Sequence, residues 1–199
     1  MSLKLVIFDV DGTLVDSIAH TEQVMDEAFV ACGYAPPPPG AVRALIGVSL
    51  PGLMAQLCPE MERGALAELQ RAYMQKYAET SARRPITETA PLFEGTREVL
   101  DALAARDDLV LAVATGKSRR GTDRLLEQHG LTRHFVSTQV ADDHPSKPHP
   151  SMVLTALAET GGDAHDALVS GDTRFDMQMA RGAGVAGIGV PWGNHPPDE

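Results

Sequence analysis

Four aspartates directly follow two short apolar segments of the sequence. Asp9 and Asp11 follow the first such segment, and Asp172 and Asp176 follow one near the C-terminus. If the two segments flank the point where strand order reverses in a parallel sheet, the four carboxylates converge on one crevice and repel one another. A hard divalent cation removes this repulsion, and ligands made only of oxygen favour Mg²⁺, which keeps waters in its shell and binds substrate phosphate. The spacing therefore predicts a Mg²⁺ site.

Groups suited to bind a phosphate follow the other apolar segments. Thr115 and Gly116 offer a hydroxyl and an unhindered backbone N–H, and Lys147 offers a positive charge. Gly12 and Thr13 open a tight turn whose backbone N–H groups can face an anion. These residues predict that a small phosphorylated molecule binds beside the metal.

Five short segments rich in branched apolar residues have the composition of strands buried on both faces of a sheet. They are residues 3–8, 109–114, 135–139, 167–170 and 186–190. Between the later segments, helical patterns span residues 119–129, 151–159 and 175–183. This alternation predicts an α/β fold with a doubly wound parallel sheet.

The stretch from residue 16 to residue 89 contains no strand pattern. Helical spacing of apolar residues spans 18–32 and 61–81, and a run of four prolines breaks the chain between them. We expect an inserted all-helical cap domain, residues 16–89, and a core domain made of residues 1–15 and 90–199. The insertion lies over the carboxyl edge of the sheet, so it is positioned to act as a lid, with hinges near Asp16 and Thr89.

Composition and charge narrow the class of protein further. The 199 residues are 43% apolar and carry a formal net charge of −10, which supports an ordinary core and argues against a nucleic-acid partner. No apolar run approaches the roughly 18 residues of a membrane helix, and aspartates come too early for a secretory signal. We expect a cytoplasmic protein without a membrane partner, as a monomer or a homodimer. Cys32 and Cys58 are interpreted as buried thiols. After residue 190 no helical pattern follows the last apolar segment, so either the fold is short at this edge of the sheet or the chain shown is missing a final strand and helix.

Four motifs, in this order and at these spacings, resemble those of the haloacid dehalogenase superfamily. They read DVDGTLVDS, ATGKS, KPHP and GDTRFDM. The helical insertion resembles the C1 cap of subfamily IA, the phosphoglycolate-phosphatase-like branch, and the resemblance covers essentially the whole chain with its Rossmann-like core. It implies that Asp9 is a nucleophile that forms an aspartyl-phosphate, and that Asp11 is the acid for the leaving group and then the base for water.

The resemblance also implies how the phosphoryl group is bound. Thr115 and Lys147 contact it with their side chains, whereas Gly12 and Gly116 contribute backbone N–H groups. The second motif reads TGK where close relatives often have Asn after the Thr, so Gly116 replaces a side-chain donor with its backbone. The next residue, Lys117, could compensate from the loop for the absent donor, but we interpret it as solvated.

The metal ligands implied by the resemblance come from the first and fourth motifs. Mg²⁺ is held by the Asp9 carboxylate, the backbone carbonyl of Asp11 and the Asp172 carboxylate. Asp176 acts mainly through water or through bonds to the other ligands, and it can also stabilise the first turn of its helix.

Three predictions concern residues outside the motifs. In the cap, Arg43 and the pair Ile46 and Gly47 resemble a loop that faces the substrate. Trp192 is expected to pack at the sheet edge. The adjacent arginines 119 and 120 are interpreted as a solvated face.

Together these features favour a Mg²⁺-dependent phosphomonoesterase acting on a small phosphorylated metabolite such as 2-phosphoglycolate. Asp11 argues against a dehalogenase, because breaking a carbon–halogen bond needs no protonation of the leaving group and the dehalogenases lack an acid at this position. The alternatives are a phosphomutase of the same branch, similar to β-phosphoglucomutase, and a non-enzymatic protein. The latter would be a binding protein for metabolites or a receiver-like signalling module.

Overall fold

The centre of the molecule is a parallel sheet of five strands. A computed structural model describes residues 3–196, with β1 (Lys4–Phe8), β2 (Leu109–Thr115), β3 (Phe135–Val140), β4 (Ala167–Gly171) and β5 (Ala186–Gly189). The strand order is β3-β2-β1-β4-β5, and every neighbouring pair is parallel. In the central strand β1, Ile7 pairs with Ala112 on one side and Val169 on the other. The predicted doubly wound α/β sheet is confirmed, and each strand begins and ends within one residue of its predicted bounds.

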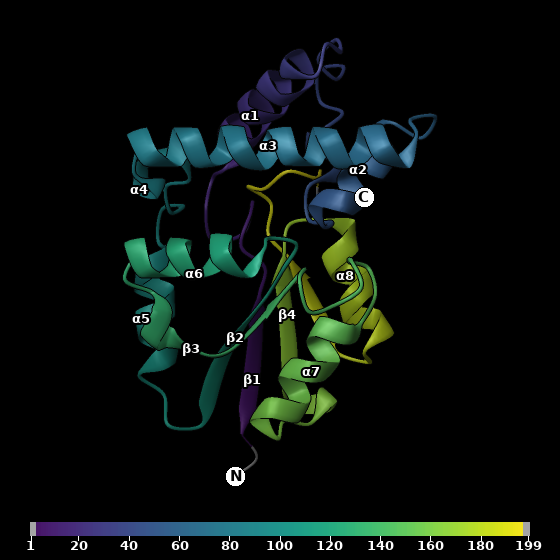
Figure 1. Cartoon of the computed structure of the whole chain (residues 1–199). Coiled ribbons are helices and arrows are strands. Elements are labelled where there is room, and N and C mark those ends of the chain that lie inside the picture. The colour runs from purple at the N-terminus through teal and green to yellow at the C-terminus, as the bar shows by residue number, and fades with distance from the viewer. Residues whose placement is uncertain (1–2, 197–199) are drawn as a thin grey trace.

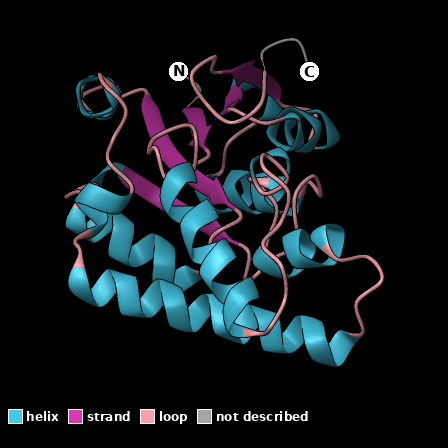
Figure 2. Cartoon of the chain, turned by 90° about the horizontal axis from the view of Figure 1, so that it is seen from above, coloured by secondary structure: helices cyan, strands magenta, loops and turns pink. Residues whose placement is uncertain are grey.

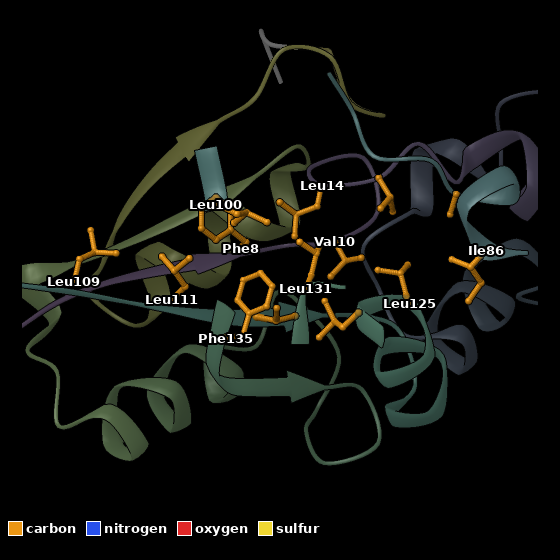
Figure 3. Close-up of a cluster of buried hydrophobic side chains, with 14 residues drawn as sticks. Phe8, Val10, Leu14, Ile86, Leu100, Leu109, Leu111, Leu125, Leu131 and Phe135 are labelled. Carbon is orange, nitrogen blue, oxygen red and sulfur yellow. The ribbon is translucent and has the colours of Figure 1, made fainter. Parts of the chain in front are cut away.

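Helices cover both faces of this sheet. One face carries α5 (Thr96–Ala104) and α6 (Arg119–Gln128), and the other carries α7 (Ser151–Thr160) and α8 (Arg174–Gly182). Figure 2 shows the strands with helices on either side. Neighbouring side chains of β1 point to opposite faces: Phe8 joins Leu100 and Leu125 in one cluster (Figure 3), whereas Ile7 joins Met152 in the other. The apolar character of β1 follows from this burial on both faces.

The chain between β1 and α5 contains helices and no strand. They are α1 (Ile18–Ala31), η1 (Arg43–Leu45), α2 (Leu50–Leu57), α3 (Arg63–Arg83) and α4 (Ile86–Thr89); two further short helices, η2 (Thr132–His134) and η3 (Ala164–Asp166), lie elsewhere. In Figure 1, α1, α2 and α3 lie beyond the carboxyl ends of the strands, at the far end from the N-terminus. Their apolar side chains form a cluster of their own, with Met25, Met54 and Leu69 fully buried, and Phe175 of α8 packs into it. The segment is helical as predicted, and its division from the core at residues 16 and 89 stays a prediction.

The two connections between the sheet and the helical segment lie side by side. The N–H of Asp16 donates to the carbonyl of Pro91 at 2.9 Å, and Val15 forms an isolated bridge with Leu92. The chain therefore leaves and re-enters the core at one place, where the sequence predicts the hinges.

Two other predictions concern the helices and the cysteines. Among the helices of residues 3–196, none has both the length and the apolar character needed to cross a membrane. Cys32 and Cys58 are free, and both are half-buried rather than buried as predicted. The reason is their position directly after the last residues of α1 and α2, where the chain turns away from the packed helix face.

Candidate active site

Asp9 lies at the carboxyl end of the central strand and is almost completely buried. Its Oδ1 accepts a hydrogen bond from Nζ of Lys147 at 2.6 Å. Its Oδ2 is buried and has no hydrogen-bond partner among residues 3–196. One carboxylate oxygen each from Asp9, Asp172 and Asp176 lie within 4.8 Å of one another. The structure thus brings three of the four predicted metal ligands together, and one oxygen of Asp9 is left without a donor among the described residues.

Asp172 follows β4 and is held by groups from both ends of the chain. Its Oδ1 accepts from the Thr13 hydroxyl at 3.2 Å, and its Oδ2 accepts from the backbone N–H and the side-chain amide of Asn194 at 2.7 and 2.9 Å. Gly12 lies against the same carboxylate, and a Cβ built on it would stand 2.0 Å from Oδ2. Because Gly12 also has a φ of +86°, both its backbone conformation and its surroundings require glycine.

Asp176 is fully buried and has two structural partners. Its Oδ1 accepts from Nζ of Lys147 at 2.6 Å. Its Oδ2 accepts from the backbone N–H and the hydroxyl of Thr173, and the Thr173 hydroxyl accepts in turn from the N–H of Asp176. This capping box begins α8, so Asp176 both stabilises the first turn of its helix and anchors Lys147.

The electrostatics of this cluster leave a deficit of positive charge. Burial raises the pKa of Asp9 well above its ordinary value, with Asp176 and Asp172 adding to the rise and Lys147 opposing it. Burial also raises the pKa of Asp172 to about 6, although Asn194 partly offsets the effect. Burial disfavours the charged form of Lys147, but the carboxylates of Asp176 and Asp9 outweigh it and hold its pKa above the ordinary value.

These observations fit a hard divalent cation. Of the three buried carboxylates, only Asp9 and Asp176 pair with an ammonium group, that of Lys147, and one oxygen of Asp9 has no donor among residues 3–196. All the candidate ligand atoms are oxygens, which is the donor set of Mg²⁺, Ca²⁺ or Mn²⁺ rather than of zinc or copper.

The Asp11 side chain lies outside this cluster. Its Oδ1 accepts a hydrogen bond from the Ser17 hydroxyl, and Nζ of Lys117 donates to both of its carboxylate oxygens, at 2.7 and 2.9 Å. Burial disfavours the charged form of Lys117, but Asp11 outweighs it and raises the pKa of that lysine. The interpretation of Lys117 as solvated is therefore wrong. The stacked rings of Tyr73 and Tyr77 from α3 line the same cavity as this ion pair.

Thr115 is the last residue of β2, the strand next to β1, and Gly116 follows it. Thr115 is completely buried, and its hydroxyl accepts from the N–H of Lys117 at 3.3 Å. A Cβ on Gly116 would stand 2.5 and 2.6 Å from the backbone carbonyl oxygens of Gly47 and Val48. The missing side chain thus lets the loop at residues 46–49 approach the end of β2, which a branched or amide side chain would prevent.

A cavity of about 560 Å³ connects these groups. Asp9, Asp11 and Thr115 line it on the sheet side, and residues 46–51 and α3 line it on the other. Ile46 and Gly47 face the cavity, as predicted for the loop in the cap. Arg43 is exposed and is not part of the lining, so its predicted place facing the substrate is wrong: the chain turns after η1, and only the residues beyond the turn reach the site.

The residues after β5 close the site in a way that the sequence does not predict. Asn194 binds Asp172, as described above, and the indole N–H of Trp192 donates to the carbonyl of Thr13 at 3.3 Å. The ring of Trp192 lies near Phe93, with ring centroids 6.2 Å apart. Trp192 thus packs over the loop that follows β1 rather than on β5, and no local pattern in this tail signals these contacts.

Comparisons with known proteins agree with this geometry. The family model for haloacid dehalogenase-like hydrolases matches residues 6–190. The chain is 37% identical to "Probable phosphatase IndB" of Dickeya dadantii, over 98% of this chain and 84% of the relative, and 32% identical to a phosphoglycolate phosphatase of Agrobacterium fabrum, over 95% and 81%. The solved structure of a predicted phosphoglycolate phosphatase from Haemophilus somnus superimposes with a TM-score of 0.85 at 25% identity, covering 98% of this chain and 88% of that one.

Proposed function

The chain belongs to the family of haloacid dehalogenase-like hydrolases, and on this premise we propose that it is a Mg²⁺-dependent phosphomonoesterase acting through an aspartyl-phosphate. The observation that carries the proposal is the buried carboxylate of Asp9, which opens on the cavity with one oxygen unpartnered among the described residues. The relatives named as phosphatases support the reaction class, and those named phosphoglycolate phosphatase make 2-phosphoglycolate the first substrate to test.

The metal would be held by the carboxylates of Asp9 and Asp172 and by the backbone carbonyl of Asp11, with Asp176 close by. When bound, it supplies positive charge that offsets the charge of the phosphoryl oxygens and of the carboxylates. Lys147 is anchored by Asp9 and Asp176 and adds the second positive charge on this side.

In the first step, a carboxylate oxygen of Asp9 attacks the phosphorus, and the bond from phosphorus to the leaving oxygen breaks. Asp11 donates a proton to that oxygen, so the leaving group departs as a neutral alcohol. Thr115 and the backbone N–H of Gly116 orient the phosphoryl group during the transfer. The predicted contribution of the Gly12 N–H does not fit the structure, because this N–H donates to the carbonyl of Val15 at 2.8 Å.

In the second step, Asp11 accepts a proton from water, the water oxygen bonds to phosphorus, and the bond from phosphorus to Asp9 breaks. Inorganic phosphate and free Asp9 result. Nζ of Lys117 donates to both carboxylate oxygens of Asp11 and holds this side chain in place.

A phosphomutase is the second candidate, because its first step is the same and its acceptor is a sugar rather than water. The observation that leaves room for an acceptor is the size of the cavity, about 560 Å³. Incubation with β-glucose 1-phosphate and detection of glucose 6-phosphate rather than inorganic phosphate would favour the mutase.

The test is release of inorganic phosphate from a panel of monoesters that includes 2-phosphoglycolate. We expect turnover with Mg²⁺, none after exhaustive chelation, and inhibition by Ca²⁺, which accepts more ligands at longer distances and can engage both oxygens of Asp9. Asp9→Asn should be inactive, whereas Asp26→Asn, which removes an exposed aspartate on α1, should retain activity. Undiminished hydrolysis after chelation, or by Asp9→Asn, would overturn the proposal.

A further inference from the structure

The cavity above Asp9 extends beyond the phosphoryl site to a wall formed by α6 and the C-terminal end of α3. This wall is lined by Arg120, Arg124 and Ser81. Arg120 and Arg124 are four residues apart, so they lie on the same face of α6. In Figure 1, α6 lies beneath the C-terminal half of α3, and a hydrogen bond from Arg124 to the backbone carbonyl of Ser81 joins the two helices.

The two arginines differ from Lys117 and Lys147 because neither forms an ion pair with a carboxylate of the described residues. Lys147 pairs with Asp9 and Asp176, and Lys117 pairs with Asp11. Neither Arg120 nor Arg124 has a carboxylate oxygen within 4.0 Å in residues 3–196, although the chain as a whole carries a net charge of −10. Arg120 was expected on a solvated face; it is exposed, but it also lines the cavity.

A second observation marks the same wall as a binding surface. The hydroxyl of Ser81 is buried and has no hydrogen-bond partner within the described part of the chain, although Ser81 lines the cavity. Buried hydroxyls are normally bonded, because leaving one unsatisfied costs free energy. The bond from Arg124 to the Ser81 carbonyl holds one arm of the guanidinium and leaves its other N–H groups available.

We infer that Arg120, Arg124 and Ser81 form a subsite for a second anionic group of the substrate, a carboxylate or a phosphate on the leaving group. The inference rests on the proposed function and deepens it by naming the substrate class: a phosphomonoester with a second negative charge. The transferring phosphoryl group has its own cation, Lys147, so the arginines of α6 are not needed to hold it. The planar fork of arginine suits two-point binding of a carboxylate or phosphate, and Ser81 adds an O–H donor.

The rival explanation is that the arginines only attract the phosphate of any monoester into the cavity. Pairs of substrates that differ only in the second charge separate the two explanations. Such pairs are 2-phosphoglycolate with 2-hydroxyethyl phosphate, 3-phosphoglycerate with glycerol 3-phosphate, and 6-phosphogluconate with sorbitol 6-phosphate. Their increasing length also reports how far the second anion lies from the phosphoryl group.

For at least one pair, we expect the anionic substrate to have a kcat/KM at least about 10-fold above its neutral partner. Arg120→Gln should lower kcat/KM for that anionic substrate by about 10–100-fold and change the neutral one by less than about 3-fold. Arg124→Gln should act in the same direction, and Ser81→Ala more weakly. Arg71→Gln is the matched control, because it removes an exposed arginine of α3 that does not line the cavity.

If the arginine variants lost equal factors in kcat/KM for both members of a pair, the arginines would only attract the phosphate, and the inference would be wrong. The inference would also be wrong if the wild-type protein showed no preference for the anionic member of any pair. Both results would leave the proposed function intact. Failure to hydrolyse any monoester would instead count against the proposed function. The subsite would still be decided by titration calorimetry of the same pairs on the Asp9→Asn protein, since affinity does not depend on turnover. Arg120 is exposed, so its replacement should leave folding intact.

Discussion

Replacement of Lys117 by methionine tests how the acid of the proposed mechanism is held. Nζ of Lys117 lies 2.7 and 2.9 Å from the two oxygens of Asp11, and the side chains are only 14% and 15% exposed. Methionine keeps an unbranched, flexible side chain that is one atom shorter, and it removes the charge. The Asp11 carboxylate is then left with Ser17 as its remaining hydrogen-bond partner in the described structure. Removing one partner of a buried ion pair costs about 3–5 kcal/mol, and the residual exposure of this pair places the expected loss near the lower end, at about 3 kcal/mol.

The assay is a double-mutant cycle, with the free energy of unfolding measured by urea denaturation. Asp11→Asn removes the charge that needs Lys117, so the double variant should recover about 2–3 kcal/mol of the sum of the two single losses. Lys76→Met is the control, because it breaks a partly exposed pair with Glu79 at 3.3 Å and should cost less than about 1 kcal/mol. Activity should fall more for esters with poor leaving groups than for activated ones, since Asp11 acts on the leaving oxygen.

The reasoning would be refuted if Lys117→Met were no more destabilising than Lys76→Met. It would also be refuted if the two single losses were simply additive in the double variant, because the ion pair would then contribute no coupling.

Three further predictions follow from single positions. Gly12→Ala should lose most Mg²⁺-dependent phosphatase activity, because its Cβ would stand 2.0 Å from an oxygen of Asp172. The positive φ of this residue should cost roughly a further 1–2 kcal/mol of stability through backbone strain. Wild-type activity of the variant would contradict this prediction. Gly116→Ala should lower kcat/KM by at least about 10-fold, because its Cβ would push away the loop at residues 46–49. Gly64→Ala is the control, since its Cβ would have no neighbour within 4 Å. Equal kcat/KM values for the two variants would disprove the close contact of the loop with Gly116. Burial lowers the pKa of His129, so the unfolded chain takes up a proton below about pH 6.5 before the folded protein does, and stability should fall as pH decreases through this range. His129→Gln should reduce this loss between about pH 7.5 and pH 5.5 in urea titrations, and an unchanged slope would refute the assignment.

The strands and helices could be predicted because their signals are local. A buried central strand must be apolar on both faces, and the prediction for the segment ending at Phe8 differs from β1 by one residue. The aspartates after β1 and β4 could be predicted to lie at one edge of the sheet, because parallel neighbouring strands bring their carboxyl ends together.

The residues whose surroundings the sequence did not predict depend on contacts between distant parts of the chain. Lys117 is buried against Asp11, more than a hundred residues earlier, beneath an α3 helix whose position the sequence pattern does not specify. Asp172 accepts a hydrogen bond from the side-chain amide of Asn194, which lies in a C-terminal segment without a helical or strand pattern in its sequence. Arg43 lies before the turn that aims the following residues into the cavity, and a shift of three residues decides which side chain faces the site.

The central claim is that Asp9 carries the phosphoryl group and Asp11 moves the protons. Intact-mass spectrometry after acid quenching tests it directly, with acetyl phosphate as the donor because its leaving group needs little protonation. The Asp11→Asn protein should accumulate an adduct with the mass of one phosphoryl group and lose it slowly, since general acid–base catalysis contributes about 10²–10⁴-fold to the rate. The Asp9→Asn protein should show no adduct under any condition. An adduct on the Asp9→Asn protein, or near-normal turnover of a poor-leaving-group ester by the Asp11→Asn protein, would contradict these roles.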